Sequence, residues 1–238
     1  MPATRTKRRP ATRTKQRRPA TTTAAKRARA HALLSHEKIR TAALRLIDQH
    51  GIAEFSTRML GRELGCEAMA IYWYYPSKEA LLDAVVDKLT SHLVLIARDA
   101  TRDWVSVLRE VAQTYRRISR EHPRAFPLLA TRRFASEETF GFLEELFELA
   151  HRQGIPDRTT AQFYRVVSSY CNGFALNELA TQNAPNDPNA GALRKRFTRV
   201  ATVSAFLEPR YLDEMFDFGL ELLLEALVRT SKAEGKLR

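Results

Sequence analysis

The chain has few cysteines and no long apolar segment. Its 238 residues include two cysteines, Cys66 and Cys171, which stand far apart and show no metal-ligand spacing. No apolar run approaches the ~18 residues that a membrane span needs. The first residues contain no hydrophobic stretch of the kind found in secretory signals. We therefore expect a cytoplasmic protein without membrane association, in which both cysteines are small core residues.

The sequence also lacks the common catalytic and cofactor-binding motifs. It contains no glycine-rich phosphate loop, no H-E-x-x-H, no C-x-x-C and no G-x-S-x-G. The six histidines are scattered along the chain. These absences predict a protein that is not an enzyme and that carries neither a metal nor a cofactor.

Glycine is scarce as well, and hydrophobic residues recur at the three- and four-residue spacing of helices. With 44% hydrophobic residues, the composition favours helices over a β-sandwich. We predict an all-α fold in three parts. These are a basic tail over residues 1–34, a three-helix domain over residues 35–80 and a larger helical domain over residues 81–238.

Residues 55–78 have the pattern of a helix-turn-helix. Ser56 is a predicted N-cap, because its hydroxyl can accept a hydrogen bond from a free N–H of the first turn. Gly65 follows where helices commonly end in a left-handed residue. A second helix is predicted from Glu67 to Tyr75, since Pro76 cannot continue it. An ordinary helical corner is the alternative, but the outer face of the second helix is small and aromatic, which suits insertion into a groove.

Two longer helices are predicted on either side of this unit. The first, over residues 35–50, is capped by Ser35 and completes a three-helix core. The second, over residues 77–98, has an apolar stripe longer than a small domain requires. We expect this second helix to link the two halves of the molecule mechanically.

The run STRMLGRELGCEAMAIYWYYPSKEALLDAV, Ser56 to Val85, resembles the DNA-binding domain of the tetracycline-repressor (TetR) family. The resemblance extends over about Ser35 to Leu89 and implies contact with double-stranded operator DNA. At Ala68 and Met69 the sequence departs from the pattern it resembles, which has a base-reading amide followed by proline. An alanine methyl and a thioether can pack on a thymine methyl but cannot form a bidentate hydrogen bond. The operator sequence is therefore not implied. The residues that the resemblance places on DNA are Thr57, Arg58, Ala68, Met69, Ala70, Tyr72, Tyr74 and Lys78.

Nearly all of the net charge of +12 lies in the predicted tail. Residues 1–30 contain eleven basic residues and no acidic one, which leaves 39 − 11 = 28 basic against 27 acidic residues elsewhere. No large apolar residue precedes Leu33, so we predict disorder. The tail is interpreted either as an arm along phosphates or in the minor groove, or as a solvated tail or misassigned start. The basic residues are Arg5, Lys7, Arg8, Arg9, Arg13, Lys15, Arg17, Arg18, Lys26, Arg27 and Arg29.

The C-terminal part is predicted to contain helices over residues 101–121, 124–132, 136–153, 158–182, 192–204 and 211–230. The last of these is apolar around more than half of its circumference, which indicates burial on two sides. With the 158–182 helix it could form an isologous four-helix homodimer interface, and a large monomer core is the alternative. The family resemblance implies the homodimer.

Aromatic residues are frequent in this C-terminal part. Most are expected in the core, and some could line a pocket for a small-molecule effector, which the family commonly binds there. The candidates are Trp104, Tyr115, Phe126, Phe147, Phe163 and Tyr170. The sequence as a whole predicts a ligand-responsive repressor that a small molecule releases from its operator. The alternative is a helical small-molecule carrier or interaction protein.

Overall fold

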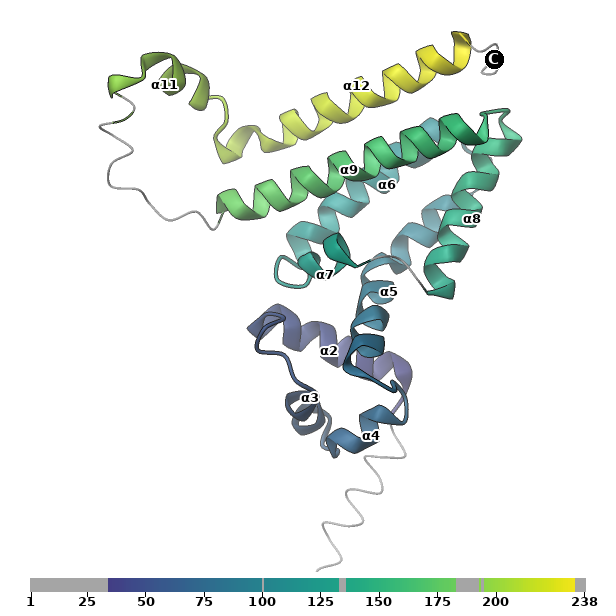
Figure 1. Cartoon of the computed structure of the whole chain (residues 1–238), viewed down its shortest axis with the longest axis vertical. Coiled ribbons are helices and arrows are strands. Elements are labelled where there is room, and N and C mark those ends of the chain that lie inside the picture. Colours follow the sequence, from purple (N-terminus) through teal and green to yellow (C-terminus); the bar gives the residue numbers. More distant parts are fainter. Residues whose placement is uncertain (1–33, 100, 133–135, 183–192, 194, 234–238) are drawn as a thin grey trace, which may run out of the picture.

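The computed structural model describes residues 34–99, 101–132, 136–182, 193 and 195–233 (Figure 1). All regular secondary structure in these ranges is helical, which confirms the all-α prediction. None of the described helices is both long enough and apolar enough to cross a membrane. The predicted tail lies outside the described residues, apart from Leu34. The elements are α2 (His36–His50), α3 (Thr57–Leu64), α4 (Ala68–Tyr72), α5 (Lys78–Ala97), α6 (Trp104–Glu121), α7 (Phe126–Thr131), α8 (Glu137–Arg152), α9 (Asp157–Gln182), α11 (Thr198–Ser204), the 3-10 turn η1 (Pro209–Tyr211) and α12 (Leu212–Ala233).

Serine N-caps begin three of the four N-terminal helices. The hydroxyls of Ser35, Ser56 and Ser77 each accept a hydrogen bond from the N–H three residues on, at 3.0 to 3.2 Å. Each bond satisfies one of the backbone donors that a helix start leaves free, and its loss typically costs about 1 kcal/mol. The predicted starts of α2, α3 and α5 are thus confirmed.

The helices α2, α3, α4 and the first half of α5 share one small core at the lower end of the molecule in Figure 1. The inward-facing residues of α2 have the predicted helical spacing. They pack against apolar residues that the short helices and α5 contribute. The buried side chains include Ile39, Ala43, Ile47, Phe55, Leu60, Ile71, Leu81 and Val85.

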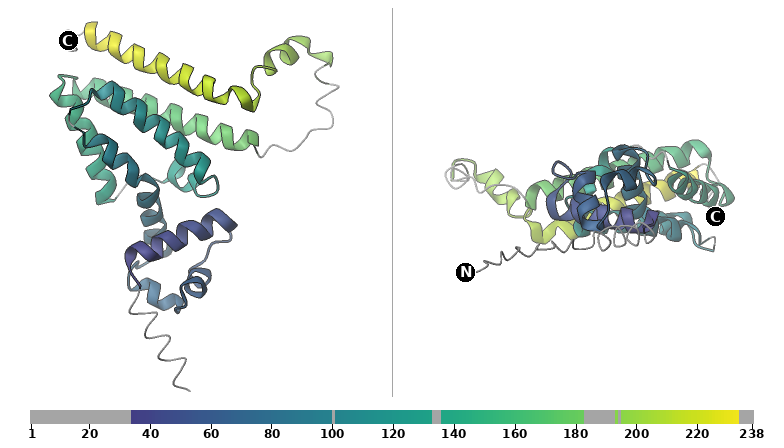
Figure 2. Two further views of the ribbon diagram at one scale, coloured as in Figure 1. Left: turned by 180° about the vertical axis from the view of Figure 1, so that it is seen from behind. Right: turned by 90° about the horizontal axis from the view of Figure 1, so that it is seen from below.

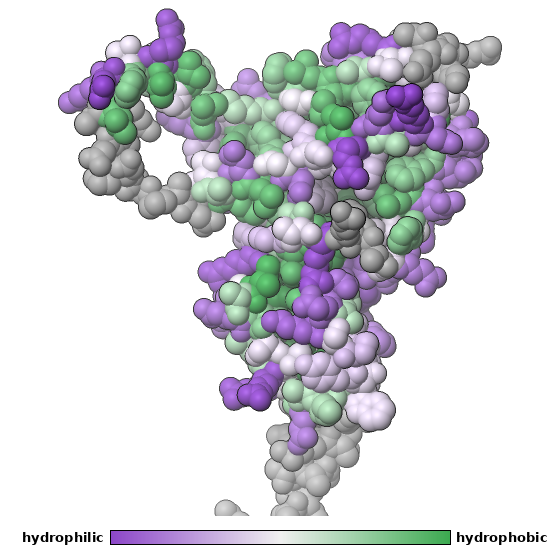
Figure 3. All heavy atoms as spheres, viewed as in Figure 1, coloured by the Kyte–Doolittle hydropathy of each residue, from purple (hydrophilic) through white to green (hydrophobic). Residues whose placement is uncertain are grey.

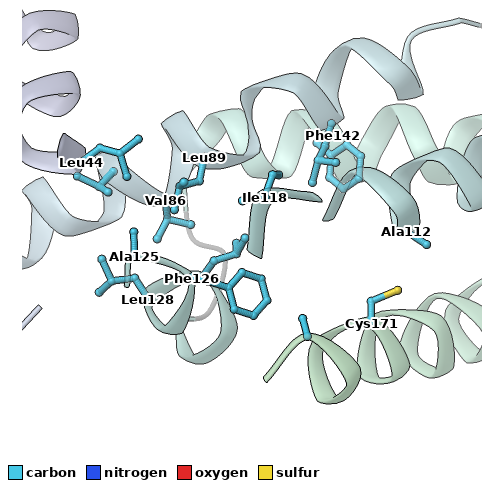
Figure 4. Close-up of a cluster of buried hydrophobic side chains, with 14 of the residues drawn as sticks. Leu44, Val86, Leu89, Ala112, Ile118, Ala125, Phe126, Leu128, Phe142 and Cys171 are labelled. Carbon is cyan, nitrogen blue, oxygen red and sulfur yellow. The ribbon is translucent and has the colours of Figure 1, made fainter. Parts of the chain in front are cut away.

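From this core α5 continues upward into the C-terminal helices (Figure 1). It contacts α2 near its start and α6, α7 and α8 beyond. Val86, Leu89 and Leu93 on α5 are buried. Figure 4 shows Val86 and Leu89 on the side of α5 that faces Ala125, just before α7, and Leu128 of α7. A displacement of the C-terminal helices can therefore reach the N-terminal core through one continuous helix.

The helices α6, α9 and α12 lie side by side in the upper part of the molecule, with α8 beside them (Figures 1 and 2). By contrast, α11 stands apart from these helices in both views (Figure 2). Its residues are at least partly exposed, and none of them is buried. Part of the predicted 192–204 helix lies outside the described residues, and the described helix begins at Thr198.

A buried ion-pair network fastens α6, α9 and α12 together. Arg116 on α6 donates to the Glu178 carboxylate on α9 at 2.9 Å, and these side chains are 7% and 1% exposed. Arg120 also donates to Glu178, at 2.7 Å, and both arginines pair with Asp213 at the start of α12. The hydrogen bond from Arg120 lowers the pKa of Asp213. The two buried charges are thus compensated by each other and by their neighbours, as burial requires.

Candidate DNA interface and effector region

The start of α3 brings three of the predicted DNA contacts together. Phe55 is buried beneath the cap of Ser56, so the next two residues begin the helix at the surface. Thr57 is half-buried, and Arg58 is exposed. The Thr57 and Tyr72 hydroxyls lie 3.3 Å apart, which joins the start of α3 to the end of α4. These two hydroxyls and the guanidinium offer a set of hydrogen-bond donors suited to phosphate oxygens.

Two glycines set the angle between α3 and α4. Gly65 ends α3 with φ of 67°, the left-handed conformation that the sequence predicts. Gly61 permits close packing, because a Cβ atom there would lie 2.9 Å from the Cys66 carbonyl oxygen and 3.2 Å from the Ala68 nitrogen. The chain can turn this tightly only where α3 has no side chain.

The outer face of α4 is apolar and open. Met69 is 70% exposed and Tyr72 38%, while Ala68 is half-buried. Ala70, however, is only 5% exposed. The inference that Ala70 contacts DNA needs correction, since its methyl group faces the interior of the domain and offers almost no surface to a partner.

Two further predicted contacts are engaged inside the protein. The Tyr74 hydroxyl donates to the Leu34 carbonyl at 3.1 Å. Lys78 Nζ donates to the Phe55 carbonyl at 2.9 Å and lies 5.7 Å from the centre of the Phe55 ring. An ammonium has three donors, so Lys78 can keep this bond and still contact a phosphate. Tyr74 is better explained as a structural residue.

The end of α4 differs from the prediction. The helix ends at Tyr72 rather than Tyr75, because Tyr75 turns into the core and its hydroxyl donates to the His36 carbonyl at 3.1 Å. Trp73 is left 84% exposed at this end. Trp73 was not among the DNA contacts predicted from the sequence. Its exposure could have been expected, because Ile71 and Tyr75 occupy the inward-facing positions and Trp73 lies between them in sequence.

The six aromatic residues proposed for an effector pocket are spread over four helices of one hydrophobic core. Trp104 and Tyr115 are eleven residues apart on α6, or about 16 Å along the axis. Trp104 and Phe126 are fully buried, and the Tyr115 ring packs edge-on against Phe126 at 5.3 Å between centroids. Trp104 thus lies at the far end of α6 from the Tyr115–Phe126 pair.

The other three candidates serve helix packing elsewhere. The Phe147 ring packs edge-on against that of Tyr164, at 5.2 Å between centroids. Phe163, the residue before Tyr164, is half-buried. Tyr170 stacks on Phe216 of α12 at 5.5 Å, and its hydroxyl donates to the Phe216 carbonyl at 2.8 Å. All six side chains belong to this core or pack against it, so their role in effector binding stays a prediction.

The Tyr115–Phe126 pair lies beside a polar bridge within this apolar core. The Tyr115 hydroxyl donates to Asn172 Oδ1 at 3.1 Å, and Asn172 Nδ2 donates to the Ala130 carbonyl of α7 at 3.2 Å. Burial raises the pKa of Tyr115, and it raises the pKa of the neighbouring Cys171 thiol to about 12. Figure 4 shows Phe126 and Cys171 among the buried side chains at this place. Small-molecule sites typically have a few convergent polar groups among mostly apolar side chains.

A shallow groove of about 250 Å³ lies elsewhere, between α6 and α12. An ion pair between Arg109 and Glu221, at 2.6 Å, crosses it, with Val105, Leu224 and Val228 along its sides. None of the six predicted effector residues lines this groove. Within the described ranges, no three histidine, cysteine or carboxylate side chains are placed to hold a metal ion.

Two protein-family models match the chain. The model of the bacterial regulatory proteins of the tetR family covers residues 39–85, and that of the tetracyclin repressor-like C-terminal domain covers residues 98–230. The second match alone extends over more than half of the chain. The chain belongs to the TetR family.

Individual TetR proteins show the same relationship. The class D tetracycline repressor of Escherichia coli is 39% identical over 87 residues, which span 36% of this chain and 40% of that repressor. The class G tetracycline repressor of Vibrio anguillarum is 26% identical over 81% of this chain and 92% of its own length. A solved TetR variant from Acinetobacter baumannii AYE, in complex with minocycline, has a TM-score of 0.64 at 24% identity, covering 83% of this chain and 98% of that one.

Membership of the TetR family confirms the resemblance seen in the sequence. It identifies the chain as a DNA-binding transcriptional regulator with an N-terminal helix-turn-helix and a tetracyclin repressor-like C-terminal domain. The alternative of a helical carrier with a docking module is not favoured. The contact between Thr57 and Tyr72 and the exposure of Arg58, Met69 and Trp73 are compatible with this function.

The contact between the two short helices gives a first prediction for this TetR protein. Gly61→Ala should lower the free energy of unfolding by about 1–3 kcal/mol, since the added methyl meets backbone atoms that cannot rotate away. Gly141→Ala is the matched control, because a Cβ on Gly141 of α8 meets nothing within 4 Å. It should instead raise stability by up to about 1 kcal/mol through helix propensity. Urea denaturation measures both, and equal effects would contradict the proposed packing role.

Proposed function

We propose that this protein is a repressor that binds operator DNA through α4 and the start of α3, and that a small molecule releases it. It acts in the cytoplasm by binding rather than by catalysis. The observation that carries the proposal is the exposed face of Met69, Tyr72 and Trp73, in the segment shortly before α5, the helix that continues into the C-terminal helices. A face with 38 to 84% exposed apolar side chains is unusual on a small domain unless a partner covers it.

The chemistry of each side chain suggests its role on DNA. Arg58 and Thr57 at the start of α3 suit phosphate oxygens, and Lys78 can add a further phosphate contact. Met69 and Ala68 can pack on thymine methyl groups in the major groove. Tyr72 has both a ring for apolar contact and a hydroxyl, 3.3 Å from that of Thr57. We therefore propose that Thr57, Arg58, Ala68, Met69, Tyr72 and Lys78 form the DNA contacts, with Trp73 added and Ala70 and Tyr74 left out.

We further propose that two copies pair through α9 and α12. Both helices have apolar side chains turned outward, with Val166 46% and Leu176 38% exposed on α9 and Phe218 67% and Leu222 47% exposed on α12. Figure 3 shows hydrophobic side chains over α12 on the face that it displays. Helices of 26 and 22 residues, about 39 and 33 Å long, are long enough for a stable four-helix interface. A two-fold dimer would place its recognition helices on half-sites about one DNA turn, ~34 Å, or a multiple apart.

This pairing leads to a second prediction. Phe218→Asp should convert the dimer into a monomer, raising the dissociation constant at least about 100-fold, since a carboxylate would be buried without a partner. Light scattering should then give the monomer mass of 27.2 kDa instead of twice that value. Phe140→Asp, which changes an equally exposed phenylalanine on α8, should leave the dimer intact. A dimeric Phe218→Asp protein would rule out this interface.

A path of polar contacts supports the response to a ligand. Asn172 holds the end of α7 through the Ala130 carbonyl. Directly after α7, Arg132 forms ion pairs with Glu79 and Asp83 in the first turns of α5. The same end of α5 carries Lys78, which binds the Phe55 carbonyl at the entry to α3.

A ligand that separates Tyr115 from Asn172 would therefore move α7 and the start of α5. In a dimer, such a shift changes the distance between the two recognition helices. Its extent is limited by the difference in ligand affinity between the two states.

The experiment that tests the function uses a duplex from the region upstream of the gene for this protein. Fluorescence anisotropy should show binding of this duplex over an arbitrary one. A thermal-shift screen then identifies compounds that stabilise the protein. At least one such compound should release the duplex, and DNA should in turn weaken that compound's binding by the same factor. Equal affinity for both duplexes would refute operator recognition.

A further inference from the structure

The segment that contains α4 lacks the side chains that usually identify base pairs. Bidentate hydrogen bonds to bases come from arginine or lysine on guanine and from asparagine or glutamine on adenine. None of these residue types occurs in residues 64–77. The one charged residue there, Glu67, precedes the first turn of α4 and is already engaged within the protein. Hydrogen bonds of this kind are therefore not available to α4.

The side chains that α4 presents to the outside are apolar or aromatic, and they share one side of the helix. Met69, Tyr72 and Trp73 are 70%, 38% and 84% exposed. Trp73 directly follows the helix and keeps helical backbone angles, so the spacing of three and four residues makes these side chains neighbours. Ala70 and Ile71 between them are buried. The helix therefore meets the domain core on one side and leaves the other side open to a partner.

The apolar group that a base edge offers in the major groove is the C5 methyl group of thymine. The flexible, polarizable side chain of Met69 can adapt its shape to such a group, and the rings of Tyr72 and Trp73 add apolar area next to it. Contact with a methyl group removes apolar surface of both molecules from water. Attraction to phosphates adds little at this helix, because α4 has no basic side chain.

We propose that α4 recognises the C5 methyl groups of pyrimidines in the major groove and derives its sequence preference from them. Thymine carries this group, cytosine and uracil lack it, and 5-methylcytosine carries it on the same ring carbon. The operator base pairs that α4 covers therefore contain thymine or 5-methylcytosine, and methylation of a cytosine there strengthens binding. This inference rests on the operator binding proposed above and names the chemical group that the operator presents.

The test compares the upstream duplex with the same duplex in which deoxyuridine replaces every thymidine. This change removes the methyl groups and keeps the base pairing, the hydrogen-bonding groups and the phosphates. One buried methyl group corresponds to about 4-fold in affinity, so the loss of two contacts should lower affinity at least about 10-fold. Fluorescence anisotropy measures this ratio. The arbitrary duplex should lose little affinity from the same replacement, because phosphate contacts dominate non-specific binding.

A pair of matched variants assigns the methyl contact to α4. Met69→Gln replaces the thioether with an amide of similar length at an exposed position, so the fold should be unchanged. The ratio of affinities for the thymine and deoxyuridine duplexes should fall at least about 3-fold, since one methyl contact is lost. Leu95→Gln makes the matching change at a 63% exposed position on α5 and should keep the full ratio. An unchanged ratio in Met69→Gln would remove Met69 from the methyl contact.

A second duplex series separates the methyl group from the rest of the base pair. Single deoxyuridine replacements first identify the thymines that matter. Replacing those T·A pairs with C·G pairs should lower affinity, and 5-methylation of the new cytosines should restore most of it. If methylation restored nothing, the hydrogen-bonding groups of the T·A pair would be the feature recognised, and the proposal would be overturned.

The outcomes also keep this inference separate from the proposed function. Equal affinity for the thymine and deoxyuridine duplexes would overturn methyl recognition. If both were still preferred over the arbitrary duplex, operator binding would stand and only its chemical basis would change. Equal affinity for the upstream and arbitrary duplexes would instead refute operator binding, and methyl recognition with it.

Discussion

The double substitution Met69→Ala with Tyr72→Ala should weaken binding of the upstream duplex at least about 100-fold. A good contact to a base edge contributes about 1–3 kcal/mol, so the loss of two contacts from the middle of this range, roughly 4 kcal/mol, exceeds the ~2.7 kcal/mol of a 100-fold change. Met69 is 70% exposed, and the Tyr72 hydroxyl bonds only loosely to Thr57 at 3.3 Å. The free protein should therefore keep its unfolding temperature to within about 2 °C, as exposed positions usually do. Anisotropy titration and differential scanning fluorimetry measure the two quantities.

Phe140→Ala is the control for loss of an exposed apolar side chain. Phe140 is 62% exposed on α8, in the C-terminal part of the molecule. This variant should bind the upstream duplex as the unaltered protein does. Affinity for the arbitrary duplex should change little in either variant, because base contacts supply the sequence-dependent part of binding. If the double variant retained its preference for the upstream duplex, α4 would not be the recognition surface.

The N-terminal domain was largely predictable because local rules agree with its tertiary structure. Ser56 and Gly65 mark a start and an end that depend on backbone hydrogen bonds a few residues away. The end of α4 was not predictable in this way. Tyr75 leaves the helix to reach the His36 carbonyl, a contact between residues 39 positions apart. The exposure of Trp73 follows from the same distant contact.

In the C-terminal region, the helices could be predicted from the sequence better than the side chains of a candidate effector site. Periodicity indicated each helix, but an aromatic residue on a helix can face a neighbouring helix, a ligand or a second copy with the same spacing. The structure shows Tyr170 engaged with α12 and Trp104 fully buried. Asn172 gave no signal in the sequence, although it bridges two helices. Its role became apparent only when Tyr115 and Ala130 were seen beside it.

The pairing of Arg116 with Glu178 is another contact that the sequence conceals. The residues are 62 positions apart, and neither stands out from the many charges on helix surfaces. The Arg116 guanidinium also lies over the Phe174 and Phe216 rings, at 5.1 and 4.7 Å from their centroids. The negative face of an aromatic ring attracts a cation, so these two rings stabilise the Arg116 charge in its buried position. The start of α12, and with it the proposed dimer helix, is therefore positioned by one buried arginine.

Glu178→Ala should accordingly cause the largest loss of stability among the changes considered. It leaves Arg116, 7% exposed, without its buried carboxylate, and removing one partner of such a pair typically costs about 3–5 kcal/mol. For a chain of this size we expect the unfolding temperature to fall by roughly 6–20 °C, at 2–4 °C per kcal/mol. Because unfolding would be coupled to dissociation of the proposed dimer, the comparison must be made at one protein concentration.

Two matched variants separate the buried charge from simple loss of packing. Glu144→Ala removes an exposed carboxylate from α8 and should shift the unfolding temperature by no more than a degree or two, as for most surface positions. Arg116→Met combined with Glu178→Leu removes both charges at similar volume. It should recover most of the loss, since an apolar pair avoids the cost of desolvating an unpaired ion. If the double variant were as unstable as Glu178→Ala alone, shape rather than charge would hold α12 against α6 and α9.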